Sequence, residues 1–107
     1  MPGTIAFRGF VFDVASRELR SAGTAVDIAR KPCDLLAHLV AHRDRVVPKS
    51  ELLNELWPGI TVSEDALTSA LRDLRRALNA TGESPVIATV RGRGYRFVAA
   101  VDDGEPR

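Results

Sequence analysis

Arginine side chains gather toward the end of the sequence. Between Thr68 and Phe97, six arginines stand against two acidic residues, although the net charge of the whole 107-residue chain is only +1. The six are Arg72, Arg75, Arg76, Arg91, Arg93 and Arg96. A guanidinium is always charged, and its paired N–H groups match a phosphate or the edge of a guanine. The pattern indicates a basic surface that could bind an anionic polymer.

Three of these arginines belong to a predicted amphipathic helix over residues 63–80. On a helix that turns 100° per residue, one side is apolar and the opposite side is polar. The apolar side carries Ala66, Leu67, Ala70, Leu71, Leu74, Ala77 and Leu78, and the polar side carries Asp65, Thr68, Ser69, Arg72, Arg75, Arg76 and Asn79. Short polar side chains come first and arginines follow, an order that suits a helix in a DNA major groove. A solvated helix face without a partner is the alternative.

The other three arginines lie in a predicted β-hairpin over residues 86–100. Two apolar-rich runs, VIATVR and YRFVA, flank the turn Gly92-Arg93-Gly94. Glycine permits the backbone angles that a tight hairpin needs. Tyr95 and Phe97 alternate, so we expect both rings to pack on the body of the domain and the arginines to project outward. A hairpin with outward-pointing arginines suits a narrow A·T-rich minor groove, whose negative potential attracts arginine.

The segments before these two elements predict a small sheet and two further helices. Residues 5–28 contain β-rich runs, which predict three or four short antiparallel strands. Apolar residues that recur every three or four positions predict helices over 31–43 and 49–57. Either Thr61, in a capping box with Glu64, or Ser63 is expected to cap the next helix. The order is strands, three helices and a hairpin, which is an α+β fold.

In this order the sequence resembles the DNA-binding domain of OmpR/PhoB-type transcriptional regulators. The resemblance covers roughly residues 5–100 and rests on RKPCDLLAHLVAHRDRVVPKSELLNELWP, VSEDALTSALRDLRRAL and IATVRGRGYRF. It implies a winged helix-turn-helix over residues 1–101, with 63–80 as the recognition helix and 86–100 as the wing. The runs ELWP and VSEDAL are most similar to members that carry this domain at the N-terminus, the CadC/ToxR-like subgroup.

The resemblance implies sequence-specific binding of double-stranded DNA for transcription regulation. On the recognition helix, Thr68, Ser69 and Arg72 would face bases in the major groove. Arg75 and Arg76 would lie nearer the DNA backbone.

The wing is implied to reach the minor groove. Arg91 matches the arginine that the family inserts there, and Arg93 is an extra charge. Arg96 is the third wing arginine expected to contact DNA. Asp73 departs from the family, because many members are basic at this position. By its place on the helix, Asp73 could pair with a neighbouring arginine, Arg72 or Arg76.

The resemblance also implies partners beyond DNA. The loop Pro58-Gly59-Ile60-Thr61 joins the second helix to the recognition helix, and in the family this loop is where RNA polymerase can be touched. Family members commonly line up head to tail on direct repeats. No apolar helix face is left over here for a two-fold dimer contact. We therefore expect a free monomer and a head-to-tail pair on DNA.

Other classes of function have little support in the sequence. His38 and His42 are four residues apart on a predicted helix, but two ligands are too few for a metal site and no cysteine or acidic residue obviously converges on them. Cys33 is expected to be a small buried hydrophobe. Without a Ser/His/Asp arrangement or paired carboxylates, no enzyme, cofactor or small-molecule ligand is predicted. A protein-interaction module stays open as the alternative, because fold does not fix function.

The resemblance implies a cytoplasmic, nucleoid-associated bacterial protein, and the composition is compatible with this location. The sequence has one cysteine, no signal-peptide pattern and no apolar run near the ~20 residues that span a membrane. Membrane tethering by a downstream segment stays open, since a recognition domain alone has no sensor. Residues 102–107 are expected to be a polar tail or the start of a linker.

Overall fold

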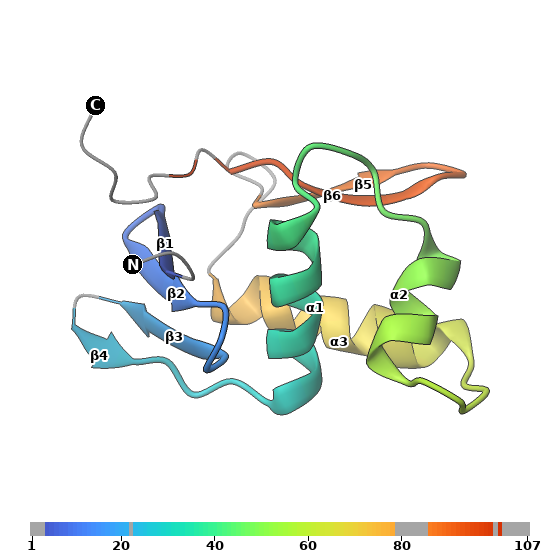
Figure 1. Cartoon of the computed structure of the whole chain (residues 1–107), viewed down its shortest axis with the longest axis horizontal. Coiled ribbons are helices and arrows are strands. Elements are labelled where there is room, and N and C mark those ends of the chain that lie inside the picture. Colours follow the sequence, from blue (N-terminus) through green and yellow to red (C-terminus); the bar gives the residue numbers. More distant parts are fainter. Residues whose placement is uncertain (1–3, 22, 79–85, 100, 102–107) are drawn as a thin grey trace.

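A sheet, three helices and a hairpin follow one another along the chain (Figure 1). The computed structural model describes residues 4–21, 23–78, 86–99 and 101. The elements are β1 (Thr4–Phe7), β2 (Phe10–Asp13), β3 (Glu18–Ser21), β4 (Thr24–Ala25), α1 (Arg30–Ala41), α2 (Lys49–Leu56), α3 (Glu64–Ala77), β5 (Ile87–Val90) and β6 (Gly94–Phe97). The predicted α+β winged helix-turn-helix order is confirmed.

The N-terminal sheet is an antiparallel meander in the order β1-β2-β3-β4. Buried and exposed side chains alternate along β2, as a half-buried strand requires, with Phe12 fully buried and Val11 exposed. Across the ladder, Phe12 stands opposite Ile5 of β1 and Leu19 of β3, both also buried. This row of apolar side chains joins the sheet to the core that the helices share.

Helix α1 packs against α2, α3 and the hairpin, which places it at the centre of the domain (Figure 1). Leu35, Leu36 and Leu39 are completely buried, and their spacing is the apolar stripe that the sequence predicted. Because full burial of a leucine contributes about 1.5–3 kcal/mol, this stripe is a principal source of stability. Among the described residues, no helix combines the length and the apolar composition that crossing a membrane requires.

Cys33 lies on the same buried side of α1, as predicted. Burial, together with the nearby carboxylate of Asp34, raises the pKa of the Cys33 thiol. The thiol therefore stays protonated and packs as a small hydrophobe.

The hairpin is joined to the helices through a third extended segment. Val47, in the connection between α1 and α2, pairs with Tyr95, and each N–H donates to the other residue's carbonyl oxygen at 2.8 and 3.0 Å. Tyr95 and Phe97 are buried, as the alternation predicted, and the ring of Phe97 meets Phe7 edge-on with centroids 5.1 Å apart. Backbone pairing and aromatic packing together hold the wing on the body of the domain.

The helix ends differ from the prediction by a few residues. α1 covers Arg30–Ala41 instead of 31–43, and α2 ends at Leu56 instead of 57. α3 begins at Glu64, so the helix starts too late for a capping box in which Glu64 would be the third helical residue. Ser63 occupies the N-cap position, but its side chain makes no capping hydrogen bond, so neither predicted cap forms. The predicted helix end at 80, the loop 80–85, Asn79 and the tail 102–107 lie outside the described residues.

Candidate nucleic-acid interface

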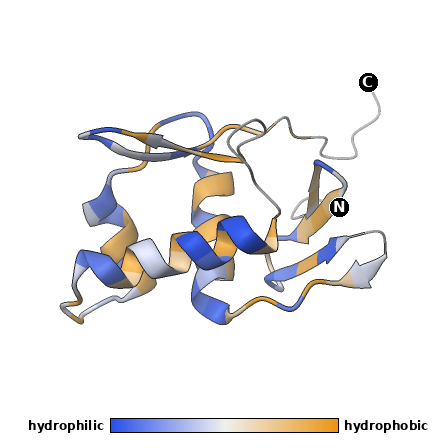
Figure 2. Ribbon diagram, turned by 180° about the vertical axis from the view of Figure 1, so that it is seen from behind, coloured by the Kyte–Doolittle hydropathy of each residue, from blue (hydrophilic) through white to orange (hydrophobic). Residues whose placement is uncertain are grey.

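The polar face of α3 is open to solvent. Thr68, Ser69, Arg72 and Arg76 are all exposed. On the opposite side, the buried residues are Leu67, Ala70, Leu71, Leu74 and Leu78. Figure 2 shows α3 in front, with hydrophilic and hydrophobic residues interspersed along its ribbon, as expected for an amphipathic helix. A rigid, well-packed helix therefore presents hydroxyl and guanidinium groups along one exposed side.

Arg75 is half-buried, unlike its exposed neighbours on α3. Its Nη2 donates to the carbonyl oxygen of Ile87 at 2.8 Å and to Oγ1 of Thr89 at 3.0 Å. Both acceptors belong to β5, so this side chain links the recognition helix to the wing. Sequence reasoning missed this contact, because a helical wheel assigns Arg75 to the polar side but does not show which distant segment lies over it.

The three predicted wing arginines are not equivalent. Arg91 and Arg93 are exposed in the turn between β5 and β6, on either side of Gly92. Gly92 has φ of +72°, in the region that favours glycine. Arg96 is exposed on β6, and its Nε donates to the carbonyl oxygen of Arg43 at 3.4 Å. Two arginines therefore mark the tip of the wing, and the third lies beside the connection between α1 and α2.

Asp73 forms no ion pair with the arginines beside it on α3. Among the ion pairs of the described residues, none joins Asp73 to Arg72 or Arg76, so the suggested pairing is not formed. Adjacent residues on a helix point in different directions, which keeps Asp73 away from Arg72. Asp73 and Arg76 instead lie at the rim of a shallow hollow that Asp27 also lines.

The loop between α2 and α3 is exposed at each of the four predicted partner residues. These are Pro58, Gly59, Ile60 and Thr61. Ile60 is 64% exposed, the highest value among the exposed large hydrophobic side chains of the described residues. Gly59 has φ of +75°, which supports its predicted role as a turn residue.

Comparison with known proteins decides the family. The family described as transcriptional regulatory protein, C terminal, matches residues 23–97, which is more than half of the chain. The chain belongs to this family. The chain is also 31% identical over 96 residues to the phosphate regulon transcriptional regulatory protein PhoB of Klebsiella pneumoniae, covering 89% of this chain and 42% of PhoB. This OmpR/PhoB-type domain therefore spans less than half the length of that relative.

Solved structures agree with this OmpR/PhoB-type assignment. The DNA-binding domain of RstA from Klebsiella pneumoniae, in complex with the RstA box, matches with a TM-score of 0.73 and 28% identity, covering 88% of this chain and 95% of that one. The DNA-binding domain of Escherichia coli CadC matches with a TM-score of 0.78 at 24% identity, over 94% and 95% of the two chains, which shows a shared fold. The family is one of transcriptional regulators, not a class of enzymes. Membership of the CadC/ToxR-like subgroup stays a prediction.

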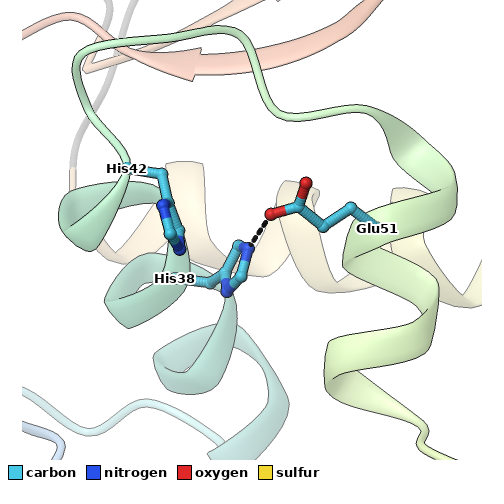
Figure 3. A group of neighbouring side chains, drawn as sticks. All are labelled: His38, His42 and Glu51. Atoms are coloured by element: carbon cyan, nitrogen blue, oxygen red, sulfur yellow. Dashed lines mark hydrogen bonds and ion pairs between the residues drawn. The ribbon is translucent and has the colours of Figure 1, made fainter.

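A second group of polar side chains lies between α1 and α2 of this OmpR/PhoB-type domain (Figure 3). His38 and His42 have ring centroids 4.4 Å apart, and Nε2 of His38 is 2.6 Å from Oε2 of Glu51. Both histidines and Glu51 are half-buried. The expectation that no acidic residue converges on the histidine pair is therefore wrong. The sequence contains no signal for this contact, because apolar periodicity does not fix which turn of α2 faces His38.

Proposed function

We propose that this domain binds double-stranded DNA sequence-specifically and thereby regulates transcription. The observation that carries the proposal is the exposed polar face of α3, joined through Arg75 to a wing with Arg91 and Arg93 at its tip. Such a helix fits the major groove, and an arginine-bearing hairpin fits a narrow minor groove. The RstA domain, similar in fold and sequence, is solved in complex with its DNA box, which supports this reading.

On the recognition helix, the proposed roles follow the order of the side chains. Thr68, Ser69 and Arg72 contact base edges, and Arg76 contacts the DNA backbone. Arg75 is assigned mainly to positioning, because its Nη2 is already bonded to β5. Its remaining N–H donors are available for a phosphate.

On the wing, Arg91 enters the minor groove and Arg93 adds a second charge at the tip. Arg96 lies farther from the tip and serves as a phosphate contact. Tyr95 and Phe97 are buried, so the backbone that carries these arginines is held by the core of the domain.

The dependence of DNA affinity on salt tests the proposal. If three to five of the six arginines neutralise phosphates, log K should fall against log salt concentration with a slope of about −2.7 to −4.5, because each phosphate contact releases condensed counterions. Titrations of the domain on DNA at several salt concentrations measure this slope. Lack of DNA binding at low salt, or a flat line, would favour the protein-interaction module instead.

Two domains are proposed to bind DNA in the same orientation. A single recognition module buries only ~600–1,000 Å² and binds weakly, so a second copy on a neighbouring half-site is needed for useful affinity. Among the described residues, the exposed large apolar side chains are Val11, Ile60 and Val98, which belong to different parts of the chain. We therefore expect a monomer by sedimentation and a preference for direct half-sites ~10–11 base pairs apart in gel shifts. A dimer without DNA, or preference for inverted half-sites, would contradict this arrangement.

The loop Pro58–Thr61 is proposed to contact RNA polymerase. Ile60→Glu should leave DNA affinity unchanged and lower transcription, because the side chain is exposed and is not among the proposed DNA contacts. Gel shifts and a reporter assay in parallel measure the two effects. Ser63→Ala, just beyond these four residues, is the control for a general loop defect, because the exposed Ser63 side chain makes no capping hydrogen bond. Lost DNA binding in Ile60→Glu would refute this division of roles.

We place this activity at the nucleoid, in the bacterial cytoplasm, free or tethered to a membrane by a further segment. The proposal concerns DNA binding by this domain, which covers 42% of the length of PhoB.

A further inference from the structure

We propose that His38, His42 and Glu51 form a binding site for a divalent transition metal, with Zn²⁺ as the reference ion. One ligand atom from each residue lies within 4.8 Å of the other two. The three side chains point toward one another from the end of α1 and the first turn of α2 (Figure 3). The site shares no residue with the proposed DNA contacts and does not depend on that function.

The donor set matches zinc. Two histidines four residues apart on a helix are a recurring zinc-binding pair, and two histidines with one glutamate are a known three-residue ligand set for zinc. Imidazole ligands argue against Ca²⁺ and Mg²⁺, which prefer oxygen ligands alone. Tetrahedral zinc at its usual bond lengths holds ligand atoms about 3.3 Å apart, so small side-chain rotations suffice.

The carboxylates near the two ring nitrogens of His38 are also compatible with a bound Zn²⁺. Its Nε2 faces Glu51 at 2.6 Å, and its Nδ1 lies 3.9 Å from Oε2 of Glu55. A histidine that binds a metal through one nitrogen commonly directs the other at a carboxylate, which fixes the orientation of the ring. A small side-chain rotation would bring Glu55 within hydrogen-bond distance for that second role. With Zn²⁺ on Nε2, the ring proton of His38 would be carried by Nδ1 and donated to Glu55.

Glu51 is available as an ionised ligand, although Arg45 competes for it. The carboxylate accepts hydrogen bonds from Arg45 at 3.1 and 2.7 Å. Its Oε2 also faces Nε2 of His38 at 2.6 Å, on the side where the proposed ion would bind. The side chain of Arg45 is 43% exposed and can turn to solvent when a metal arrives. Removing the Arg45 side chain should therefore raise the affinity of the site for Zn²⁺. If Arg45 and Glu51 formed only a structural ion pair, the same change would not strengthen metal binding.

Titration of the whole chain with Zn²⁺ tests the site. Calorimetry measures the stoichiometry and affinity, and thermal melting measures the stabilisation. We expect one ion per chain, and a melting temperature about 10–20 °C higher at a Zn²⁺ concentration one hundred times Kd. Co²⁺ as a probe should give the visible spectrum of a four-coordinate ion without a thiolate band, since Cys33 is buried and is not a ligand.

Two substitutions should change the Zn²⁺ affinity of the site in opposite directions. His42→Gln should weaken Zn²⁺ binding by at least about 100-fold, because loss of a ligand costs more than loss of an outer partner. Arg45→Gln should tighten binding by severalfold. Circular dichroism confirms that each variant is folded. No binding by the wild-type chain, binding unchanged in His42→Gln, or weaker binding in Arg45→Gln would each overturn the proposal.

Discussion

Replacing Gly94 by alanine is expected to destabilise the domain by about 3–5 kcal/mol and to release the wing. Gly94 has φ of +152°, and a methyl group built there would lie 2.0 Å from the carbonyl oxygen of Val47 and 2.9 Å from Cα of Pro48. That carbonyl oxygen accepts the hydrogen bond from the N–H of Tyr95. The neighbouring atoms are backbone, so the collision cannot be relieved by moving a flexible side chain. The pairing between the hairpin and the α1–α2 connection must open.

Chemical denaturation and thermal melting measure this loss. For a domain of this size, the effect corresponds to a fall in melting temperature of roughly 15–30 °C. Gly92→Ala is the matched control, since Gly92 also has a positive φ, of +72°, but open space around it. The control should cost only about 1–2 kcal/mol, the penalty of the backbone conformation alone. Equal stability of the two variants would show that the close approach at Val47 is not what anchors the wing.

Arg72→Ala is expected to weaken binding to the preferred DNA site by roughly 5- to 150-fold, with a much smaller loss on random DNA. Arg72 is exposed on the polar face of α3, one turn after Thr68, where a long side chain reaches a base edge in the major groove. A bidentate bond to a base is worth about 1–3 kcal/mol, and all of it is specific to sequence. Folding should survive, because no described core contact depends on this side chain.

Arg76→Ala is the control for Arg72→Ala. Arg76 is also exposed on α3, but it is proposed to contact the DNA backbone. Its loss should weaken preferred and random DNA alike and reduce the salt slope by about 1. Fluorescence titrations of both variants on a selected site and on random DNA compare the two effects. Equal losses for Arg72→Ala on both DNAs would make it a phosphate contact and refute base reading.

Much of the fold could be predicted because its signals are local. The 3.6-residue period of the leucines in α1 and α3 determines which side of each helix is buried, whatever the helix packs against. The alternation of Tyr95 and Phe97 and the glycines around Arg93 likewise identify a hairpin and its buried face from neighbouring residues alone. Helix ends were less predictable, since the last turns depend on caps and contacts that form only in the folded chain. The α3 start at Glu64 is one such case.

The sequence by itself therefore determined the order of elements, their buried faces and the exposed arginines of α3 and the wing. Only the tertiary structure decided which distant groups meet. It bonds Arg75 to β5, brings Glu51 to the histidines of α1, and places Gly94 against the backbone of Val47. Each of these contacts joins residues 9 or more positions apart along the chain. Periodicity fixes the direction of a side chain relative to its own helix or strand, whereas such contacts depend on how whole elements pack, which no local pattern encodes.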